Sequence, residues 1–181
     1  MSQTEDFVIQ DGVLTEYRGH GSHAVIPEGV IEIDAEVFFR NQELQSITLP
    51  ASLCRIGDSA FENCTALESM TFPKGISEIP DCAFAGCISL RSISLPERLK
   101  VISYRAFDGC ASLQTLDLPE GLLSIEEYAF AGCSSLQKLI LPCHMESLAY
   151  KAFSHCSGLQ KVVILGSLSH MGRRVFEGCR S

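Results

Sequence analysis

The sequence predicts a β-rich repeat solenoid, a right-handed coil with a parallel sheet along one face and short helical turns on the other. The main observation is that phenylalanine recurs every 23 residues, at Phe38, Phe61, Phe84, Phe107, Phe130, Phe153 and Phe176. Columns of leucine, cysteine and proline follow the same period. Self-similarity of this length is typical of units that cannot bury their apolar side alone and therefore stack.

The end of each unit predicts a short strand. Apolar residues follow the pattern Leu-x-x-Ile-x-Leu, as at Leu113, Leu116 and Leu118, and the final period of two places alternate side chains inward. Proline then ends the strand because it lacks the N–H that would extend a ladder. It stands there in five units, at Pro50, Pro73, Pro96, Pro119 and Pro142.

The other half of each unit predicts a turn. A second apolar pair, such as Leu122 and Ile125, precedes an Ala-Phe step, which we expect to open one short helical turn. Glycine tolerates the left-handed conformation that ends such a turn. It follows the step in four units, at Gly86, Gly109, Gly132 and Gly178.

Two regions follow from this pattern. We expect an N-terminal cap at 1–23 and a repeat array at 24–181, made of about seven 23-residue units. The last unit is incomplete, since the sequence ends at Ser181, before the leucine of a next strand. An open last coil is a candidate surface for self-association.

Six of the nine cysteines occupy one repeat column, at Cys64, Cys87, Cys110, Cys133, Cys156 and Cys179. We expect them to be buried and reduced, because parallel neighbours keep their Cβ atoms about 5 Å apart and a disulfide needs roughly 3.5–4.5 Å. Cys54, Cys82 and Cys143 are expected to be exposed. The sequence has no Cys-x-x-Cys, so we expect no metal and no cofactor.

The charge pattern narrows the class of partner. A net charge of −8 argues against nucleic acid as a partner. Residues 1–90 hold 14 acidic and 4 basic residues, whereas 91–181 hold 8 acidic and 10 basic ones. No apolar run reaches the roughly 18 residues of a membrane helix, so we expect no membrane insertion. The first residues lack a basic leader followed by an apolar stretch, and on sequence alone we expect a cytoplasmic location.

One unit shows the whole pattern. The general form of the repeat is Ile-x-x-x-Ala-Phe-x-Gly-Cys-x-x-Leu-x-x-Ile-x-Leu-Pro. The unit at 125–142 follows it, with leucine in place of the second isoleucine. In this pattern the chain resembles the BspA-type leucine-rich repeat of bacterial proteins, from about 24 to 181. The resemblance implies a leucine-rich-repeat coil that binds proteins without catalysis, often host or matrix proteins, from secreted or surface-attached chains. It transfers no catalytic residue, because the shared motif is scaffold.

The outward positions of the strands give the candidate site. Small hydroxyl residues occupy these positions in the first units, whereas Ile140 and Val163 occupy them near the C-terminal end. Exposed apolar patches tend to mark interaction sites. We therefore predict a protein-binding spot at this pair, bordered by polar and charged residues of the same face: Lys138, Lys161, Gln137, Gln160 and Asp117. The alternative is that the two β-branched residues only strengthen the sheet.

Three functions remain open on the sequence. The first is a non-catalytic protein-binding module, in an adhesin-like form if the resemblance extends to function. The second is a structural spacer or a fragment of a longer surface protein. The third is a thiol enzyme, for which His155-Cys156 is the candidate pair, although Cys156 belongs to the repeat column and is better explained by packing.

Overall fold

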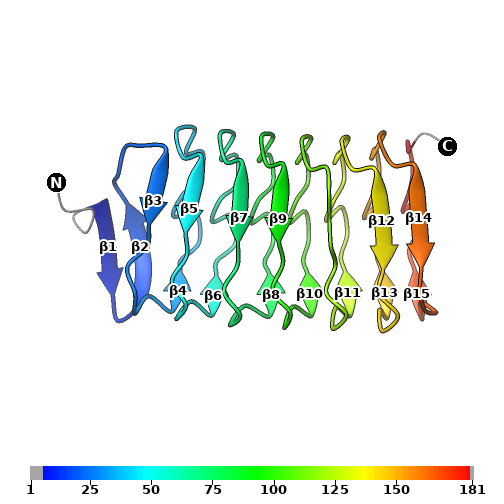
Figure 1. Cartoon of the computed structure of the whole chain (residues 1–181), viewed down its shortest axis with the longest axis horizontal. Helices are drawn as coiled ribbons and strands as arrows, with labels where there is room; N and C mark the ends of the chain where they lie inside the picture. The colour runs from blue at the N-terminus through cyan, green and yellow to red at the C-terminus, as the bar shows by residue number, and fades with distance from the viewer. Residues whose placement is uncertain (1–5, 180–181) are drawn as a thin grey trace.

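The computed structural model describes residues 6–179, which form an elongated coil of about seven turns (Figure 1). The regular elements of this part are fifteen short strands, and the predicted β-rich solenoid is confirmed. The N-terminal end carries a hairpin of β1 (Phe7–Gln10) and β2 (Val13–Tyr17), which pair antiparallel. This hairpin and the last described coil lie at opposite ends of the molecule (Figure 1).

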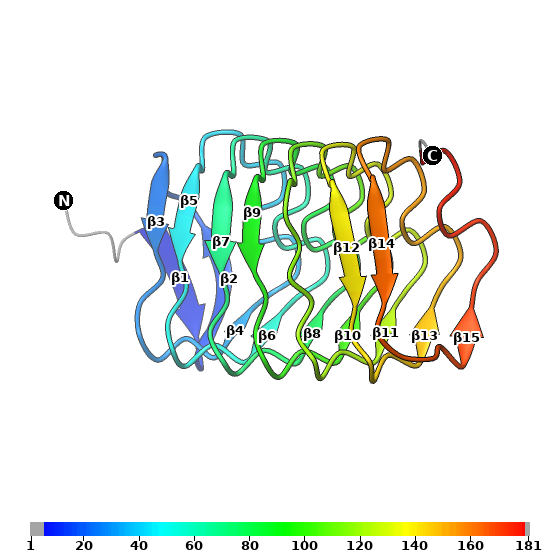
Figure 2. The same cartoon turned by 45° about the vertical axis from the view of Figure 1, so that its right-hand side comes forward.

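The predicted parallel sheet runs along one face. Its first part contains β3 (His23–Val25), β5 (Ser46–Thr48), β7 (Ser69–Thr71) and β9 (Ser92–Ser94). Its second part contains β12 (Lys138–Leu141) and β14 (Lys161–Ile164). The segment 112–118 runs between the two parts without forming a strand, although Leu116 is still buried (Figure 2). We call the outward side of these strands the strand face.

A second set of parallel strands lines another face, and the sequence analysis did not predict it. These strands are two residues long: β4 (Glu32–Ile33), β6 (Arg55–Ile56), β8 (Glu78–Ile79), β10 (Val101–Ile102), β11 (Ser124–Ile125), β13 (Ser147–Leu148) and β15 (His170–Met171). Each holds the second member of the second apolar pair, such as Ile102 and Ile125, which are fully buried. A two-residue strand is too short to show the alternation by which strands are recognised in a sequence.

Each Ala-Phe step forms isolated turns, with no helix there in residues 6–179. In one unit, Glu62 N–H donates to Ser59 C=O at 3.0 Å and Cys64 N–H donates to Phe61 C=O at 3.1 Å. Ser59 and Asn63 have positive φ, 55° and 60°, and a residue in this left-handed region cannot continue a right-handed helix. The predicted glycine positions do adopt this conformation, with φ from 72° to 74°.

The turns are joined by hydrogen bonds that we call the turn ladder. In one seam between coils, the N–H groups of Ser59, Phe61 and Asn63 donate to carbonyl oxygens of the next coil at 2.7–2.9 Å. The same three bonds recur in all six seams from Glu36 to Glu177, and every donor points toward the C-terminal end. The ladder satisfies backbone groups that the turns would otherwise leave without partners.

The core is a stack of aromatic rings flanked by leucine, isoleucine and cysteine. Phe61, Phe84, Phe107, Phe130 and Phe153 are fully buried, and neighbouring rings in this row are 5.1–5.3 Å apart and nearly parallel. The thiols pack beside them, and each column cysteine donates from Sγ to a phenylalanine carbonyl 26 residues earlier, at 3.0–3.4 Å. The cysteines therefore serve as buried hydrogen-bonding spacers between coils.

Candidate protein-binding face

The structure brings the four central residues of the predicted site together. Strands β12 and β14 pair in parallel, with Ile140 opposite Val163 and Lys138 opposite Lys161. In β12 the side chains alternate, so that Leu139 is fully buried whereas Ile140 is exposed by 36%. Alternation on a strand puts Lys138 and Ile140 on the same outward side.

Of the two apolar residues predicted to be exposed on the strand face, Val163 is less exposed than expected. The Val163 side chain is half-buried, whereas its neighbours Val162 and Ile164 are 38% and 45% exposed to solvent. Those two occupy inward positions of the repeat, and no described coil stacks over them. The exposed apolar surface of this region therefore has two parts, one on the strand face and one at the end of the coil.

The two lysines have no acidic partner among residues 6–179, where the ion pairs involve other side chains. Like charges directly opposite each other on a sheet are destabilising. Their pairing therefore costs some stability, and it places two positive charges beside Ile140.

The polar residues of the prediction border this spot. Asp117, Gln137, Lys138 and Ile140 line one shallow pocket of about 160 Å³, together with the segment 114–116. Gln160 is exposed beside Gln137, and the Gln160 N–H donates to the Gln137 carbonyl at 2.9 Å. All seven predicted residues thus lie on three neighbouring coils.

The N-terminal part of the strand face has larger hollows with plainer chemistry. Two pockets of about 530 Å³ and 310 Å³ lie over β3 to β9, and small hydroxyl side chains such as Ser69 and Thr71 line both. The His23 ring nitrogen Nδ1 shares a hydrogen bond of 2.7 Å with Ser46 Oγ. These pockets are larger than the one at Ile140. The first is lined by Glu28 and the second by Asp117, and neither is lined by a lysine or an arginine.

A cluster of aromatic and basic residues at the turns was missed. The guanidinium of Arg105 lies 5.2 Å and 5.4 Å from the rings of Tyr104 and Tyr128, and the Lys151 ammonium lies 5.9 Å and 5.5 Å from Tyr128 and Tyr150. Lys151 also pairs with Glu177 at 2.9 Å. Because both cations are engaged within the chain, we assign this cluster to stabilising the seams. Tyr104 and Tyr150 share one position of the repeat, two units apart, whereas Tyr128 lies one position later in its unit, so the period gave only a partial signal.

The buried thiols of the repeat column are poor nucleophiles. Burial raises the pKa of Cys64 and of Cys156 to about 12, and raises the pKa of Cys87, Cys110 and Cys133 well above the usual value of 9.0. A thiol is nucleophilic only as the thiolate. Cys54 and Cys143 are exposed, as predicted, whereas Cys82 is half-buried.

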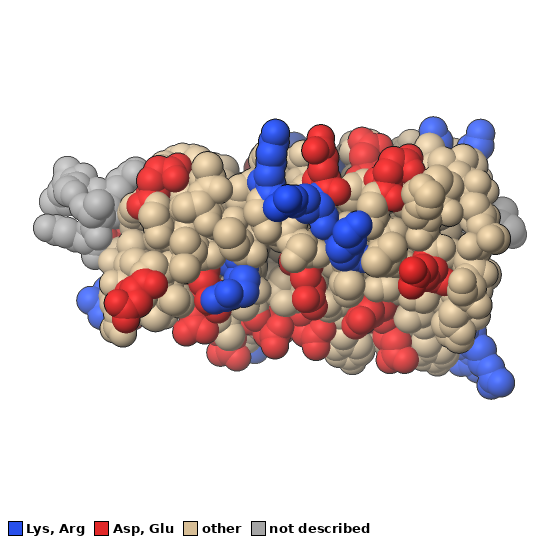
Figure 3. Space-filling view, turned by 90° about the horizontal axis from the view of Figure 1, so that it is seen from below, with Lys and Arg blue, Asp and Glu red and all other residues tan. Residues whose placement is uncertain are grey.

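Residues 6–179 also lack a metal site and a membrane-spanning helix. No group of three or more His, Cys, Asp or Glu side chains is placed to hold a metal ion. None of the described segments forms a helix that could cross a membrane. The face in Figure 3 shows acidic side chains along much of its length, with basic ones between them.

Comparisons with known proteins agree with this architecture. The model of the BspA type leucine rich repeat region matches residues 17–81 and 55–181, in six copies. No functionally curated protein matches the chain.

Three solved structures illustrate the similarity. A leucine-rich repeat protein of T. pallidum is 34% identical over 92% of this chain and 80% of that one, with a TM-score of 0.88. A leucine-rich repeat protein of Bacteroides ovatus is 25% identical over 93% of this chain and 56% of that one, with a TM-score of 0.65. A leucine rich cell surface protein of Faecalibacterium prausnitzii is 33% identical over 87% of this chain and 36% of that one, with a TM-score of 0.58.

Proposed function

The chain belongs to the family of BspA-type leucine-rich repeat proteins, and we propose that it is a non-catalytic protein-binding module. The observation that carries the proposal is the spot on β12 and β14, where Ile140 and Val163 lie beside two lysines without acidic partners. Large, rigid scaffolds that display a few exposed side chains are well suited to binding, because little order is lost when a partner docks.

The chemistry of the spot defines the partner we expect. An apolar side chain of the partner would cover Ile140 and Val163, and acidic groups at its border would offset the charges of Lys138 and Lys161. Interfaces concentrate their binding energy in a few central residues. We therefore expect the apolar pair to supply most of the affinity and the lysines to supply association rate and selectivity.

We further propose an adhesin-like role at a bacterial surface, in which the partner is a host or matrix protein. The family match and the description of the Faecalibacterium prausnitzii relative as a cell surface protein support this location. The alternative location, inside the cell, predicts that the partner comes from the bacterium itself.

The experiment is a binding comparison between two double variants. Purified chain is tested against extracellular-matrix and host-cell proteins, and in parallel against a lysate of the source bacterium. In Ile140→Ser/Val163→Ser, affinity for the captured protein should fall by about 2 kcal/mol or more, the size typical of a central interface residue. The matched control Thr48→Ala/Thr71→Ala, on the same strand face, should retain it.

Stability must be followed at the same time. If the melting temperature of Ile140→Ser/Val163→Ser falls so far that the loss of binding follows unfolding, the two residues serve the sheet alone. Equal losses in both double variants would also contradict the assignment of the spot.

A second candidate function is that of a structural spacer, which would associate with another polypeptide through the C-terminal end of its coil. It is favoured by the exposed apolar residues at the C-terminal end of the coil, Val162, Ile164, Leu165 and Met171. If this end associates with a second copy, the chain should sediment as a dimer, and Ile164→Lys should return it to a monomer. A monomer in the unchanged chain at high concentration would count against the spacer.

A further inference from the structure

The cap and the first full coil differ in length by four residues. Strand β2 pairs with β4 at an offset of 19 residues, with Val13 opposite Glu32. Strand β3 pairs with β5 at the repeat offset of 23, with His23 opposite Ser46. The stretch between the paired strands is therefore four residues shorter in the cap, which lacks part of the turn that the first coil forms at 37–40.

The missing residues are those of the turn that builds the ladder. Tyr17 replaces the absent phenylalanine in the aromatic stack, because its ring lies 4.9 Å from that of Phe38. Burial raises the pKa of the Tyr17 phenol, as expected for a ring inside the stack. The cap therefore continues the core, but its described part, residues 6–23, contains no turn that donates N–H groups to the first coil.

A row of carbonyl oxygens is left open as a result. In every later seam, carbonyls at the positions of Asp58, Ala60 and Glu62 accept N–H groups from the coil before. The equivalent carbonyls of the first coil belong to Ala35, Val37 and Phe39, and no described residue donates a hydrogen bond to them.

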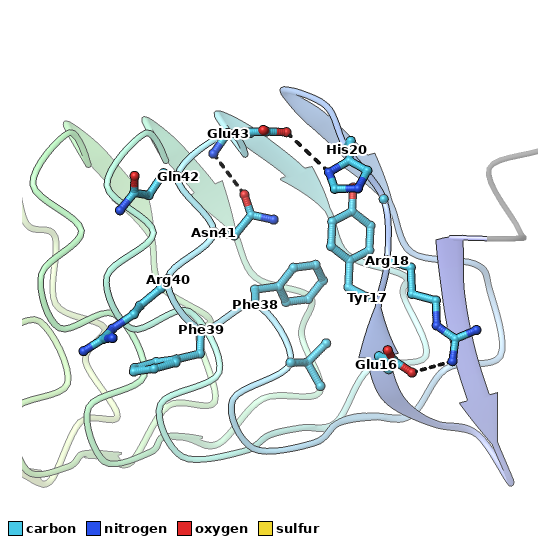
Figure 4. Close-up of a pocket in the computed structure, with 12 residues that line it drawn as sticks. Glu16, Tyr17, Arg18, His20, Phe38, Phe39, Arg40, Asn41, Gln42 and Glu43 are labelled. Carbon is cyan, nitrogen blue, oxygen red and sulfur yellow. Dashed lines mark hydrogen bonds and ion pairs between the residues drawn. The ribbon is translucent and has the colours of Figure 1, made fainter.

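The row of carbonyls runs into a hollow, which we call the notch: Val37 and Phe39 line it, whereas Ala35 lies outside its lining. The notch has a volume of about 590 Å³ and is lined by the segments 16–20 and 37–43 (Figure 4). Volumes of this order are typical of ligand sites. The floor of the notch includes Phe38, which is almost fully buried, and Figure 4 shows its ring beside that of Tyr17.

The charges around the notch balance. Arg18 pairs with Glu16 at 2.7 Å, and His20 lies 3.9 Å from Glu43 (Figure 4). Arg40 lies over the ring of Phe39, 4.9 Å from its centre. A charged ligand would meet charges of both signs, whereas a neutral group rich in hydrogen-bond donors would find open acceptors in the backbone carbonyls.

We propose that the notch binds a polypeptide turn of a partner protein, which donates three backbone N–H groups to the carbonyls of Ala35, Val37 and Phe39. The molecule itself makes this interaction six times. In each seam, three N–H groups from the turn of the preceding coil donate to the equivalent three carbonyls at 2.6–3.2 Å. The interaction extends a backbone ladder, as in strand addition to a sheet edge, but at a row of turns. This site is independent of the spot on β12 and β14.

The test uses a peptide copied from the chain's own ladder. The blocked peptide Ser-Tyr-Arg-Ala-Phe-Asp-Gly, which reproduces residues 103–109, contains the donors of Arg105, Phe107 and Gly109. We expect its titration into ¹⁵N-labelled chain to shift amide signals in 16–20 and 36–43 at roughly millimolar concentrations, the range for a few neutral hydrogen bonds. The same peptide, N-methylated at its three donors, should bind about tenfold more weakly or worse.

Two protein variants give a second readout. His20 lines the notch, so His20→Trp should narrow it and weaken peptide binding. Its matched control is Gly21→Trp, since a Cβ at Gly21 would meet nothing within 4 Å and Gly21 does not line the notch. The proposal is overturned if the peptide causes no saturable shifts, if its shifts lie elsewhere, or if N-methylation leaves its affinity unchanged.

Discussion

Phe107 in a central coil is fully buried between two rings, whereas Phe176 in the last described coil is half-buried and has a ring on one side only. The spacing also differs, because Phe107 lies 5.1 Å from Phe130 and Phe176 lies 6.0 Å from Phe153. Both residues occupy the same column of the repeat. The comparison shows that a repeat position becomes core only when coils stack on both of its sides.

The largest effect that this comparison predicts concerns the aromatic stack. Phe107→Ala should destabilise the chain by about 3–5 kcal/mol, the usual cost of a large cavity in a packed core. Phe176→Ala should cost clearly less, since part of that ring is already in solvent. Urea unfolding followed by circular dichroism measures both. Equal losses would mean that the last coil is packed as firmly as the central ones.

An intermediate effect is expected from alkaline pH. Burial raises the pKa of Cys64 and Cys156 from 9.0 to about 12 in the folded chain. The unfolded chain loses these protons first, so the stability they contribute is fully present below pH 9 and is lost as pH rises toward 12. Unfolding free energies measured across this range should fall.

The control for this effect replaces a column thiol. Cys110→Ala in a central coil should flatten the alkaline decline, whereas Cys143→Ala at an exposed position should leave it unchanged. A decline that is identical in all three proteins would assign it to other groups, such as tyrosine.

The smallest effect is one of reactivity rather than stability. Cys54 and Cys143 should react with a thiol reagent at the rate of a free thiol, and the buried column thiols should react only after unfolding. Cys179, half-buried in the last coil, should fall between them. Mass spectrometry of the labelled peptides over time gives the order. Fast labelling of Cys110 would contradict the burial of the column.

Most of the fold could be predicted from the sequence because every unit repeats the same residues. The periodic Phe, Leu, Cys and Pro columns define which side chains are inward, and stacking follows from them. The second set of strands could not be predicted, since a two-residue strand such as Val101–Ile102 depends on its neighbours for hydrogen bonds. The predicted helical turns are isolated turns in the structure, because the backbone at Ser59 and Asn63 is in the left-handed region. The residue types at these positions do not indicate that conformation.

The sites were predictable to different degrees. Ile140 and Val163 differ from the hydroxyl residues elsewhere in their column, so they could be identified as exceptions to a pattern. The notch could not be identified in this way, because it arises from four residues that the cap lacks. Its signal is a difference between two strand offsets, 19 and 23, and only a structure provides the first of them.

The uniform seams also make the molecule a ruler. Each coil adds one ring to the stack, and neighbouring rings between Phe38 and Phe153 are 4.8–5.3 Å apart. The notch lies at one end of this scale and the spot on β12 and β14 near the other. Inserting or deleting one 23-residue unit between them would change the distance between the two sites by the spacing of one coil. Neither site would itself be altered. If both proposed sites are occupied, the number of units between them sets how far apart the two partners are held.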